Sequence, residues 1–203
     1  MHPTRRLVVV STLLGAALGA SGCLPLAATG VAVASIAALD RRTLGAQTED
    51  TEIELRGANR MPDSVKGARG VTVTSYNRRV LLTGQVPDDA AKADAERTMR
   101  NVQGVREVFN ELETASRVTF STVAADTSIT TRVMAGFVEQ KVLSVNAVKA
   151  VTENGVVYLM GLVTQREGPA YATVASRVTG VRRVVTLFEY ITEDELAKIG
   201  ARR

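Results

Sequence analysis

The sequence is poor in the residues that carry most catalytic and metal chemistry. Its 203 residues include one histidine, His2, one cysteine, Cys23, and no tryptophan. His2 lies in a predicted export signal and Cys23 follows it directly, so we expect the mature chain to have no histidine and no free thiol. This excludes Ser-His-Asp and Cys-His catalysis and His/Cys zinc sites. A G-x-x-x-x-G-K-[ST] phosphate loop is also absent.

Carboxylates are the remaining candidates for acid-base chemistry, and their positions favour structural roles. Asp88-Asp89 begins a predicted helix, where negative charge complements the helix dipole. Asp50 and Asp126 resemble helix caps, and Glu193-Asp194-Glu195 lies in a charged tail. A catalytic carboxylate needs a cleft and a perturbed pKa. The sequence therefore predicts a protein that is not an enzyme and holds no cofactor and no metal.

Aromatic residues and unbalanced charge are also scarce. Four Tyr and four Phe offer few stacking platforms for nucleic-acid bases. The chain has 25 basic and 21 acidic residues, and removing Arg5 and Arg6 with residues 1–22 leaves 23 against 21, a net charge of +2. Such a weak, mixed charge predicts no nucleic-acid partner. It is compatible with modest attraction to an anionic membrane.

Residues 1–22 have the pattern of a secretory signal peptide. Arg5-Arg6 precede an apolar run that is too short to span a bilayer, and small residues lead to Cys23. The A-S-G-C sequence resembles the lipobox of bacterial lipoproteins, in which cleavage makes the cysteine N-terminal and its sulfur carries diacylglycerol. Ala20 stands where leucine is usual. We predict lipidation of Cys23, with acyl chains such as palmitate.

The segment after Cys23 is predicted to be a lipidated N-terminal linker, residues 23–47. Two or more acyl chains give stable anchoring, whereas one gives marginal binding. Leu24, in place of Asp, resembles lipoproteins that are passed on to the outer membrane. Residues 24–39 are apolar and rich in small side chains. We expect them to lie against lipid beside the anchor rather than to cross the membrane.

The remainder of the chain contains one unit of about 76 residues written twice. Each copy has a turn, an apolar strand ending in glycine, and a later Gly-Val-Arg signal. The matching segments are 77–86 with 154–163, 104–108 with 180–184, and Asp50–Ile53 with Asp126–Ile129. The duplication predicts two small domains of the same fold, with boundaries at 48–113 and 125–192, a linker at 114–124 and a tail at 193–203.

Local patterns give each copy the order helix-strand-strand-helix-strand. In the first copy we expect a capping box at Thr51–Glu54 after a polar linker at 40–50, with helix termination at Pro62. Strands on either side of Asn77 form a hairpin. A helix begins at Pro87-Asp88-Asp89, with Gly104 as its left-handed C-cap. A last strand covers 105–112.

The second copy repeats this order with a longer first helix, predicted over Thr127–Leu143. Its hairpin turn is Asn154-Gly155, since both residues accept positive φ. Thr164–Glu167 is a second capping box, and Gly180 repeats the C-cap. The predicted fold class is α+β, in which each αββαβ unit packs a three-stranded mixed sheet on two helices. The free faces of the two sheets could cover each other.

This pattern resembles the BON domain, and two such units behind a lipobox resemble dual BON-domain outer-membrane lipoproteins. The resemblance rests on segments Asp126–Thr131, Thr152–Gly155, Leu159–Thr164 and Ala175–Val178. It implies a lipid-anchored protein on the periplasmic face of the outer membrane that supports membrane integrity. It also implies binding of anionic, phosphatidylglycerol-like phospholipid through the first helix of the second unit, and a link to the β-barrel assembly machinery.

The first helix of the second copy has apolar residues beyond those that one core face needs. At 100° per residue, Ile129, Val133, Gly136 and Phe137 share the predicted core face. Met134, Val138 and Val142 form a second stripe about 120° away. The candidate phospholipid-binding residues are Ser128, Thr131, Arg132, Met134, Ala135 and Val138. Relatives place a Trp where this chain has Ser128.

The second stripe has two interpretations. It could meet lipid, with Arg132 and Lys141 attracting anionic headgroups at about 1 kcal/mol each. It could instead pack on the first copy as an inter-domain contact. A different class of function is also open, a protein-interaction adaptor in envelope or β-barrel assembly that accepts a partner at an exposed strand edge. Such an adaptor could also use the first copy. The first copy has the shorter helix, and this asymmetry between the copies is the best indication of where function lies.

Overall fold

The repeat predicted from the sequence is present in the structure as two copies of one topology. The computed structural model describes residues 40–201 except 62–64, 66–70, 115–119 and 141–142. Residues Leu39–Arg203 form one compact unit. Residues 44–114 are called the first repeat below, and residues 120–191 the second. The signal peptide, Cys23 and residues 24–39 lie outside the described residues.

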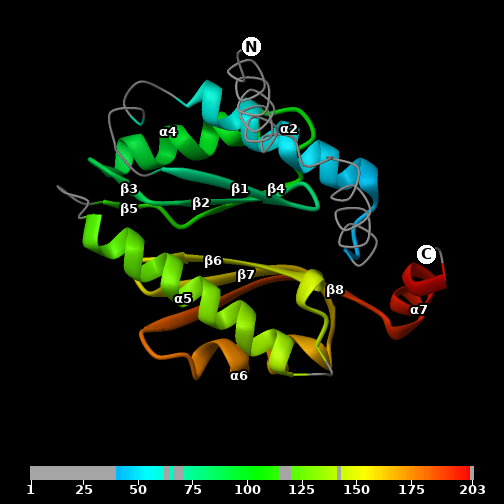
Figure 1. Cartoon of the computed structure of the whole chain (residues 1–203). Coiled ribbons are helices and arrows are strands. Elements are labelled where there is room, and N and C mark those ends of the chain that lie inside the picture. Colours follow the sequence, from blue (N-terminus) through cyan, green and yellow to red (C-terminus); the bar gives the residue numbers. More distant parts are fainter. Residues whose placement is uncertain (1–39, 62–64, 66–70, 115–119, 141–142, 202–203) are drawn as a thin grey trace, which may run out of the picture. The chain divides into compact units, whose positions relative to one another are not determined.

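The first repeat has the predicted order of elements. Helix α2 (Leu44–Arg60) is followed by strands β1 (Thr72–Tyr76), β2 (Arg79–Thr83) and β3 (Gln85–Val86), helix α4 (Asp89–Arg100) and strands β4 (Glu107–Asn110) and β5 (Glu113–Thr114). The main sheet has the order β1-β2-β4, with β1 antiparallel and β4 parallel to β2. Figure 1 shows α2 and α4 on one face of it.

The second repeat is the same fold with longer strands. Its elements are α5 (Phe120–Glu139), the short 3₁₀ turn η1 (Val145–Ala147), β6 (Val148–Glu153), β7 (Val156–Thr164), α6 (Glu167–Ser176) and β8 (Arg183–Ile191). The sheet order β6-β7-β8 again pairs an antiparallel and a parallel neighbour with the central strand. The predicted α+β class with three-stranded mixed sheets on two helices is confirmed.

Each repeat has its own apolar core between helices and sheet. In the first, the α4 residues Ala91, Ala95 and Met99 are buried, as their spacing predicts. In the second, Ile129, Val133 and Phe137 of α5 are buried against β7 and α6. The Phe137 ring meets the Tyr171 ring edge-on at 5.0 Å between centroids. Burial of such side chains supplies most of the stability of small domains.

A third apolar cluster joins the opposite faces of the two sheets. Tyr76 and Leu81 of the first repeat belong to it with Tyr158, Met160 and Leu187 of the second. The Tyr76 hydroxyl donates to the Ala147 carbonyl at 3.0 Å. Burial raises the pKa of Tyr158 to about 12, with the nearby Glu111 carboxylate adding to the effect. The prediction that the two copies cover each other is therefore confirmed.

Charged residues at the start of the described chain reinforce this contact. Arg41 donates from both guanidinium Nη atoms to the Glu167 carboxylate at 2.7 and 2.6 Å, and also to the Leu162 carbonyl at 2.8 Å. The adjacent Arg42 pairs with Asp50 at 2.7 Å and lies over the Tyr76 ring. Arg41 thus binds the second repeat, whereas Arg42 binds the first. We call residues 40–42 the arginine clasp.

Several predicted helix limits are wrong. Helix α2 begins at Leu44, and its N-cap Thr43 accepts from the Ala46 amide. Residues 44–50 are therefore helical rather than a linker, and Thr51–Glu54 lies inside the helix instead of beginning it. Helix α5 begins at Phe120, within the predicted linker. The two helices have 17 and 20 residues, so the second is the longer one as predicted, but the first is not short. The charged tail forms helix α7 (Glu193–Ala201).

Asp50 and Asp126 are not helix caps. Both lie inside their helices, are buried, and point at the hairpin of their own repeat. Asp126 accepts from the Asn154 and Gly155 amides, each at 2.8 Å. Asp50 accepts from the Asn77 and Arg78 amides at 2.7 Å. The repeated aspartate satisfies turn amides that would otherwise be buried without a partner.

The predicted turn and cap chemistry is otherwise present. Asn154 and Gly155 have φ of 49° and 72°, and Gly104 and Gly180 have φ of 92° and 97°. Thr164 and Glu167 form the reciprocal capping box through bonds of 2.9 and 3.4 Å. Gly161 of β7 lies where two backbone segments approach closely. A Cβ there would lie 2.5 Å from the Ala147 carbonyl oxygen, so the close neighbour is the backbone at the end of η1.

Candidate membrane-contact helix

The outward face of α5 carries an apolar surface that nothing in the described structure covers. Val123 and Val138 are 55% and 64% exposed, unusually high for valine. Their positions, with those of Thr127, Thr131 and Ala135, fall on one side of the helix. Between Val123 and Val138 the only ionisable residues are Asp126, which is buried, and Arg132. This face is called the α5 outer face below.

Threonine hydroxyls on this face are satisfied by the helix itself. Thr127 donates to the Val123 carbonyl at 2.9 Å, and Thr131 donates to the Thr127 carbonyl at 2.9 Å. A hydroxyl bonded to the i−4 carbonyl does not need water as its partner. The face can therefore leave water at a lower desolvation penalty than its threonine content suggests.

Of the candidate residues chosen from the sequence, all but Met134 are exposed. Ser128, Thr131, Arg132, Ala135 and Val138 are exposed on α5. Met134 is only partly exposed and packs against the core of its own repeat, so its assignment to a free apolar stripe is wrong. Neither Met134 nor Val138 is buried against the first repeat. Val142 and Lys141 lie outside the described residues.

Sequence reasoning missed Val123, because the predicted helix began only at Thr127. Its signal was available in the spacing, since Val123, Thr127 and Thr131 follow one another at four-residue intervals. Gly136 has the predicted place on the core face. A Cβ there would meet the Val174 side chain of α6 at 3.0 Å, so the glycine lets the two helices approach closely.

The corresponding helix of the first repeat has a different surface. Leu44 and Leu55 are 70% and 64% exposed on α2. They are accompanied by acidic side chains that form ion pairs, including Glu52 with Arg56 at 2.6 Å and Glu49 with Arg78 at 2.5 Å. The difference between the repeats is thus the charge on the exposed helix face rather than helix length.

The basic residue that borders the α5 outer face, Arg132, is available to an anion. Arg132 donates through Nε to the Ser128 carbonyl at 3.2 Å and forms no ion pair with any described residue. Most arginines in the described part of the chain are paired with carboxylates. An exposed, unpaired guanidinium near apolar side chains suits contact with a membrane surface, where anionic headgroups lie above the apolar acyl chains.

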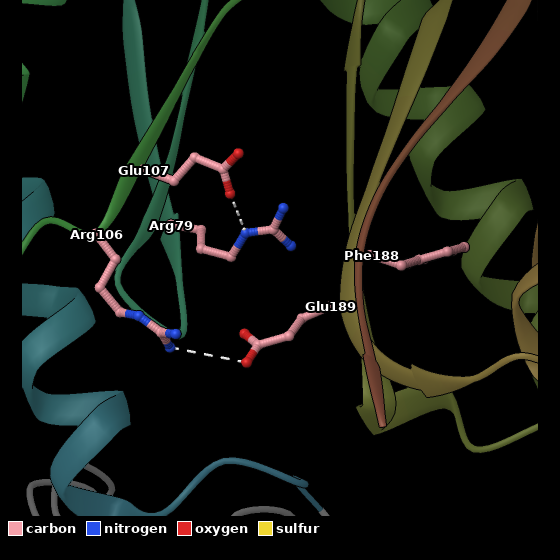
Figure 2. A pocket seen from close by; sticks show the side chains of 5 residues that line it. All are labelled: Arg79, Arg106, Glu107, Phe188 and Glu189. Carbon is pink, nitrogen blue, oxygen red and sulfur yellow. Dashed lines mark hydrogen bonds and ion pairs between the residues drawn. The ribbon is translucent and has the colours of Figure 1, made fainter. Parts of the chain in front are cut away.

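A pocket between β2, β4 and β8 is a second candidate site, but its charged groups already have partners. Arg79 donates to Glu107 at 2.7 Å and Arg106 pairs with Glu189 at 3.7 Å. Figure 2 shows these four side chains facing one another, whereas Phe188 points away from them. The Glu189 carboxylate also accepts a hydrogen bond from the Asn77 side-chain amide at 2.8 Å. The charged side chains of this pocket therefore link the two repeats, and few of them are free to bind a ligand.

The described residues form no further cluster that resembles a metal or catalytic site. No cluster of His, Cys, Asp and Glu among them has the arrangement of a metal site. Burial raises the pKa of Glu153, with Asp126 and Glu113 contributing repulsion, but these carboxylates surround a structural turn. Among the helices of residues 40–201 that the structure describes, none combines the length and hydropathy needed to cross a bilayer.

Comparison with known proteins agrees with this fold. The BON domain model matches residues 49–116 and 125–192. The chain is 37% identical over 194 residues to outer membrane lipoprotein DolP of Haemophilus influenzae, covering 94% of this chain and 98% of that protein. It is 32% identical over 155 residues to a 21 kDa hemolysin of Actinobacillus pleuropneumoniae, covering 75% and 80%.

Likeness to solved structures is weak. The C-terminal domain of CdsD, a structural protein of the type III secretion system of Chlamydia trachomatis, is 11% identical. The match covers 66% of this chain and 96% of that domain, with a TM-score of 0.29.

Proposed function

From the premise that this chain belongs to the family of BON-domain proteins, we propose that it is a lipid-anchored outer-membrane lipoprotein that binds anionic phospholipid through α5. The observation that carries the proposal is the α5 outer face, where Val123 and Val138 are exposed and which Arg132 borders. The similarity to an outer membrane lipoprotein over nearly the whole chain supports the location. Cys23, lipidated, would hold the protein at the periplasmic face of that membrane.

The α5 outer face is suited to shallow insertion at a lipid interface. A helix that lies in this plane buries its apolar side among the headgroups and upper acyl chains, and basic residues remain at the rim. Val123, Val138 and the threonine methyl groups would supply the apolar contact, and Arg132 the attraction to anionic headgroups. Without a tryptophan, each contact is small. The acyl anchor compensates by keeping the helix at high local concentration.

Vesicle binding by residues 39–203, which form a compact unit and lack the anchor, tests this function. We expect binding to phosphatidylglycerol vesicles and little to phosphatidylcholine vesicles. Val138→Asp places a charge on the inserted face and should weaken binding about tenfold or more. Leu55→Asp is the matched control, since Leu55 has the same 64% exposure on α2.

Two outcomes would contradict the proposal. Equal sedimentation with both kinds of vesicle would remove the headgroup preference. An equal effect of the Val138 and Leu55 substitutions would remove α5 as the contact.

An adaptor function is the second candidate, and the open edge of β8 favours it. In the order β6-β7-β8, the nine residues of β8 pair with β7 on one side. An edge strand can accept an extended segment of a partner, such as a component of the β-barrel assembly machinery. Cross-linking in cells separates the candidates, because a dominant protein partner that is retained by the Val138→Asp variant would favour the adaptor.

A further inference from the structure

A second unpaired arginine lies on the same side of the second repeat as α5. Arg182 is exposed, precedes β8, and forms no ion pair with a described residue. Its Nη1 donates to the Asn154 carbonyl at 3.2 Å, and its side chain passes over Gly155, where a Cβ would lie 2.9 Å from the arginine Cδ. The close contact fixes the direction of the side chain across the hairpin.

The loop at Gly180 brings Arg132 towards this second arginine. A Cβ on Gly180 would lie 3.8 Å from Nη2 of Arg132, and the Gly180 carbonyl oxygen borders Gly155 beneath the Arg182 side chain. Gly180 therefore lies beside the Arg132 guanidinium and close to the place where the Arg182 side chain crosses Gly155. Each group is oriented by one bond to a backbone carbonyl, through Nε of Arg132 and Nη1 of Arg182, and has further N–H donors available.

Strand alternation separates Arg182 from its neighbour Arg183. Arg183 faces the first repeat, where it lies 4.0 Å from Glu111. Val185 and Leu187, which share its face, belong to the cluster between the sheets, whereas Val184 packs with the helices. Since successive side chains on a strand point to opposite faces, Arg182 lies on the helix side with α5.

We propose that Arg132 and Arg182 together form the contact site for the phosphate group of a membrane phospholipid. The proposal rests on the proposed function and deepens it, because it adds a loop residue far from α5 in sequence. Two guanidinium groups brought near the same loop offer several N–H donors to phosphate oxygens. This pair borders the α5 outer face, where headgroups would lie when that face meets acyl chains.

The nearby carboxylates do not cancel this positive charge. Asp126 is buried and its oxygens accept from the Asn154 and Gly155 amides. Glu153 is partly buried beside it, and its pKa is raised, first by burial and then by repulsion from Asp126 and Glu113. Glu113 is exposed and accepts from the Asn154 side-chain amide at 3.4 Å, so of these three carboxylates it alone is exposed to an anionic ligand beside Arg182.

The test compares Arg182→Gln with Arg183→Gln in residues 39–203. The two variants lose the same charge at adjacent positions, so a nonspecific charge effect weakens both equally. We expect Arg182→Gln and Arg132→Gln each to weaken binding to phosphatidylglycerol vesicles about fivefold, and Arg183→Gln to have little effect. Free glycerol phosphate at the same phosphate concentration should not displace the protein, because the apolar contact is missing. Unchanged urea midpoints confirm folding.

Equal effects of Arg182→Gln and Arg183→Gln would overturn the site while leaving phospholipid binding by α5 in place. Absence of binding by the unsubstituted protein would instead remove the proposed function and this site with it. Displacement by glycerol phosphate would show a site for a soluble phosphate rather than for a lipid.

Discussion

At the scale of single residues, the most informative feature is the buried aspartate in the first helix of each repeat. Its carboxylate ties the middle of a helix to the two-residue turn of the hairpin below it. The sequence shows that Asp50 and Asp126 correspond, but a helix-cap interpretation is the ordinary one for aspartate near a helix start. The correct role depends on a contact between residues nearly 30 positions apart, which local patterns do not contain.

Replacing this carboxylate should destabilise the protein more than replacing an exposed one. Asp126→Asn removes the charge that strengthens two amide hydrogen bonds and is expected to lower the free energy of unfolding by about 2–3 kcal/mol. Asp94→Asn on the exposed surface of α4 is the control, with an expected change below about 0.5 kcal/mol. Urea denaturation measures both, and similar values for the two variants would contradict the turn-anchoring role.

At the scale of elements, the strands, the caps and the start of α4 were predictable from the sequence, whereas the starts of α2 and α5 were not. Asn154-Gly155 and the glycines at 104 and 180 have backbone conformations that few other residues adopt, so their signals are local. Helix α2 instead begins in Thr43-Leu44-Gly45, where glycine and exposed leucine give no clear helical pattern. Tertiary contacts of Asp50 and Ile53 hold this first part of the helix in place.

The Thr43 cap provides a direct measure of that early helix start. Its hydroxyl accepts from the Ala46 amide at 3.1 Å. We expect Thr43→Ala to lower the free energy of unfolding by about 1 kcal/mol, the usual contribution of such a cap. Thr51→Ala, at the position where the sequence predicted the helix start, should change it by less than about 0.5 kcal/mol, since Thr51 lies inside the helix and its hydroxyl bonds to the Gln47 carbonyl. The opposite order in thermal or urea unfolding would contradict the observed helix start.

The candidate site was predictable as a helix but only partly as a set of residues. Helical spacing places Val138 and Arg132 outside the core, as observed. Spacing cannot show that Met134 packs against the core of its own repeat, because that contact depends on how the rest of the repeat folds around α5. Arg182 was missed for a similar reason, since only the folded chain brings the loop at Gly180 beside α5.

At the scale of the whole molecule, the arginine clasp makes the two repeats depend on each other. Arg41 and Glu167 are both buried, so removal of one partner leaves the other charge without its counterpart. We expect Arg41→Leu to lower the free energy of unfolding by about 3–5 kcal/mol. The double variant Arg41→Leu with Glu167→Leu should recover part of this loss, because neither charge remains buried. Calorimetry that shows no difference between the single and double variants would contradict the clasp.

The clasp also predicts a dependence of stability on pH. Burial alone would raise the pKa of Glu167, but hydrogen bonds from Arg41 and the Thr164 amide lower it overall from the ordinary 4.5. A carboxyl with a lowered pKa in the folded state stabilises the protein above that ordinary value, and the contribution is lost as the pH falls through the folded value. The stability difference between wild type and Glu167→Gln should therefore shrink below about pH 4.5. A constant difference between pH 7 and pH 3 would exclude this linkage.

The clasp finally sets an order of events during synthesis. Arg41 leaves the ribosome early, but its carboxylate partner lies 126 positions later in the chain. Until Glu167 has been made, Arg41 stays unpaired and the sheet face around Tyr76 and Leu81 lacks its cover. An interrupted chain would keep both features exposed, and such apolar surface is what chaperones and proteases recognise in unfinished proteins. Only a chain that extends past Glu167 can form the Arg41–Glu167 ion pair and cover this sheet face.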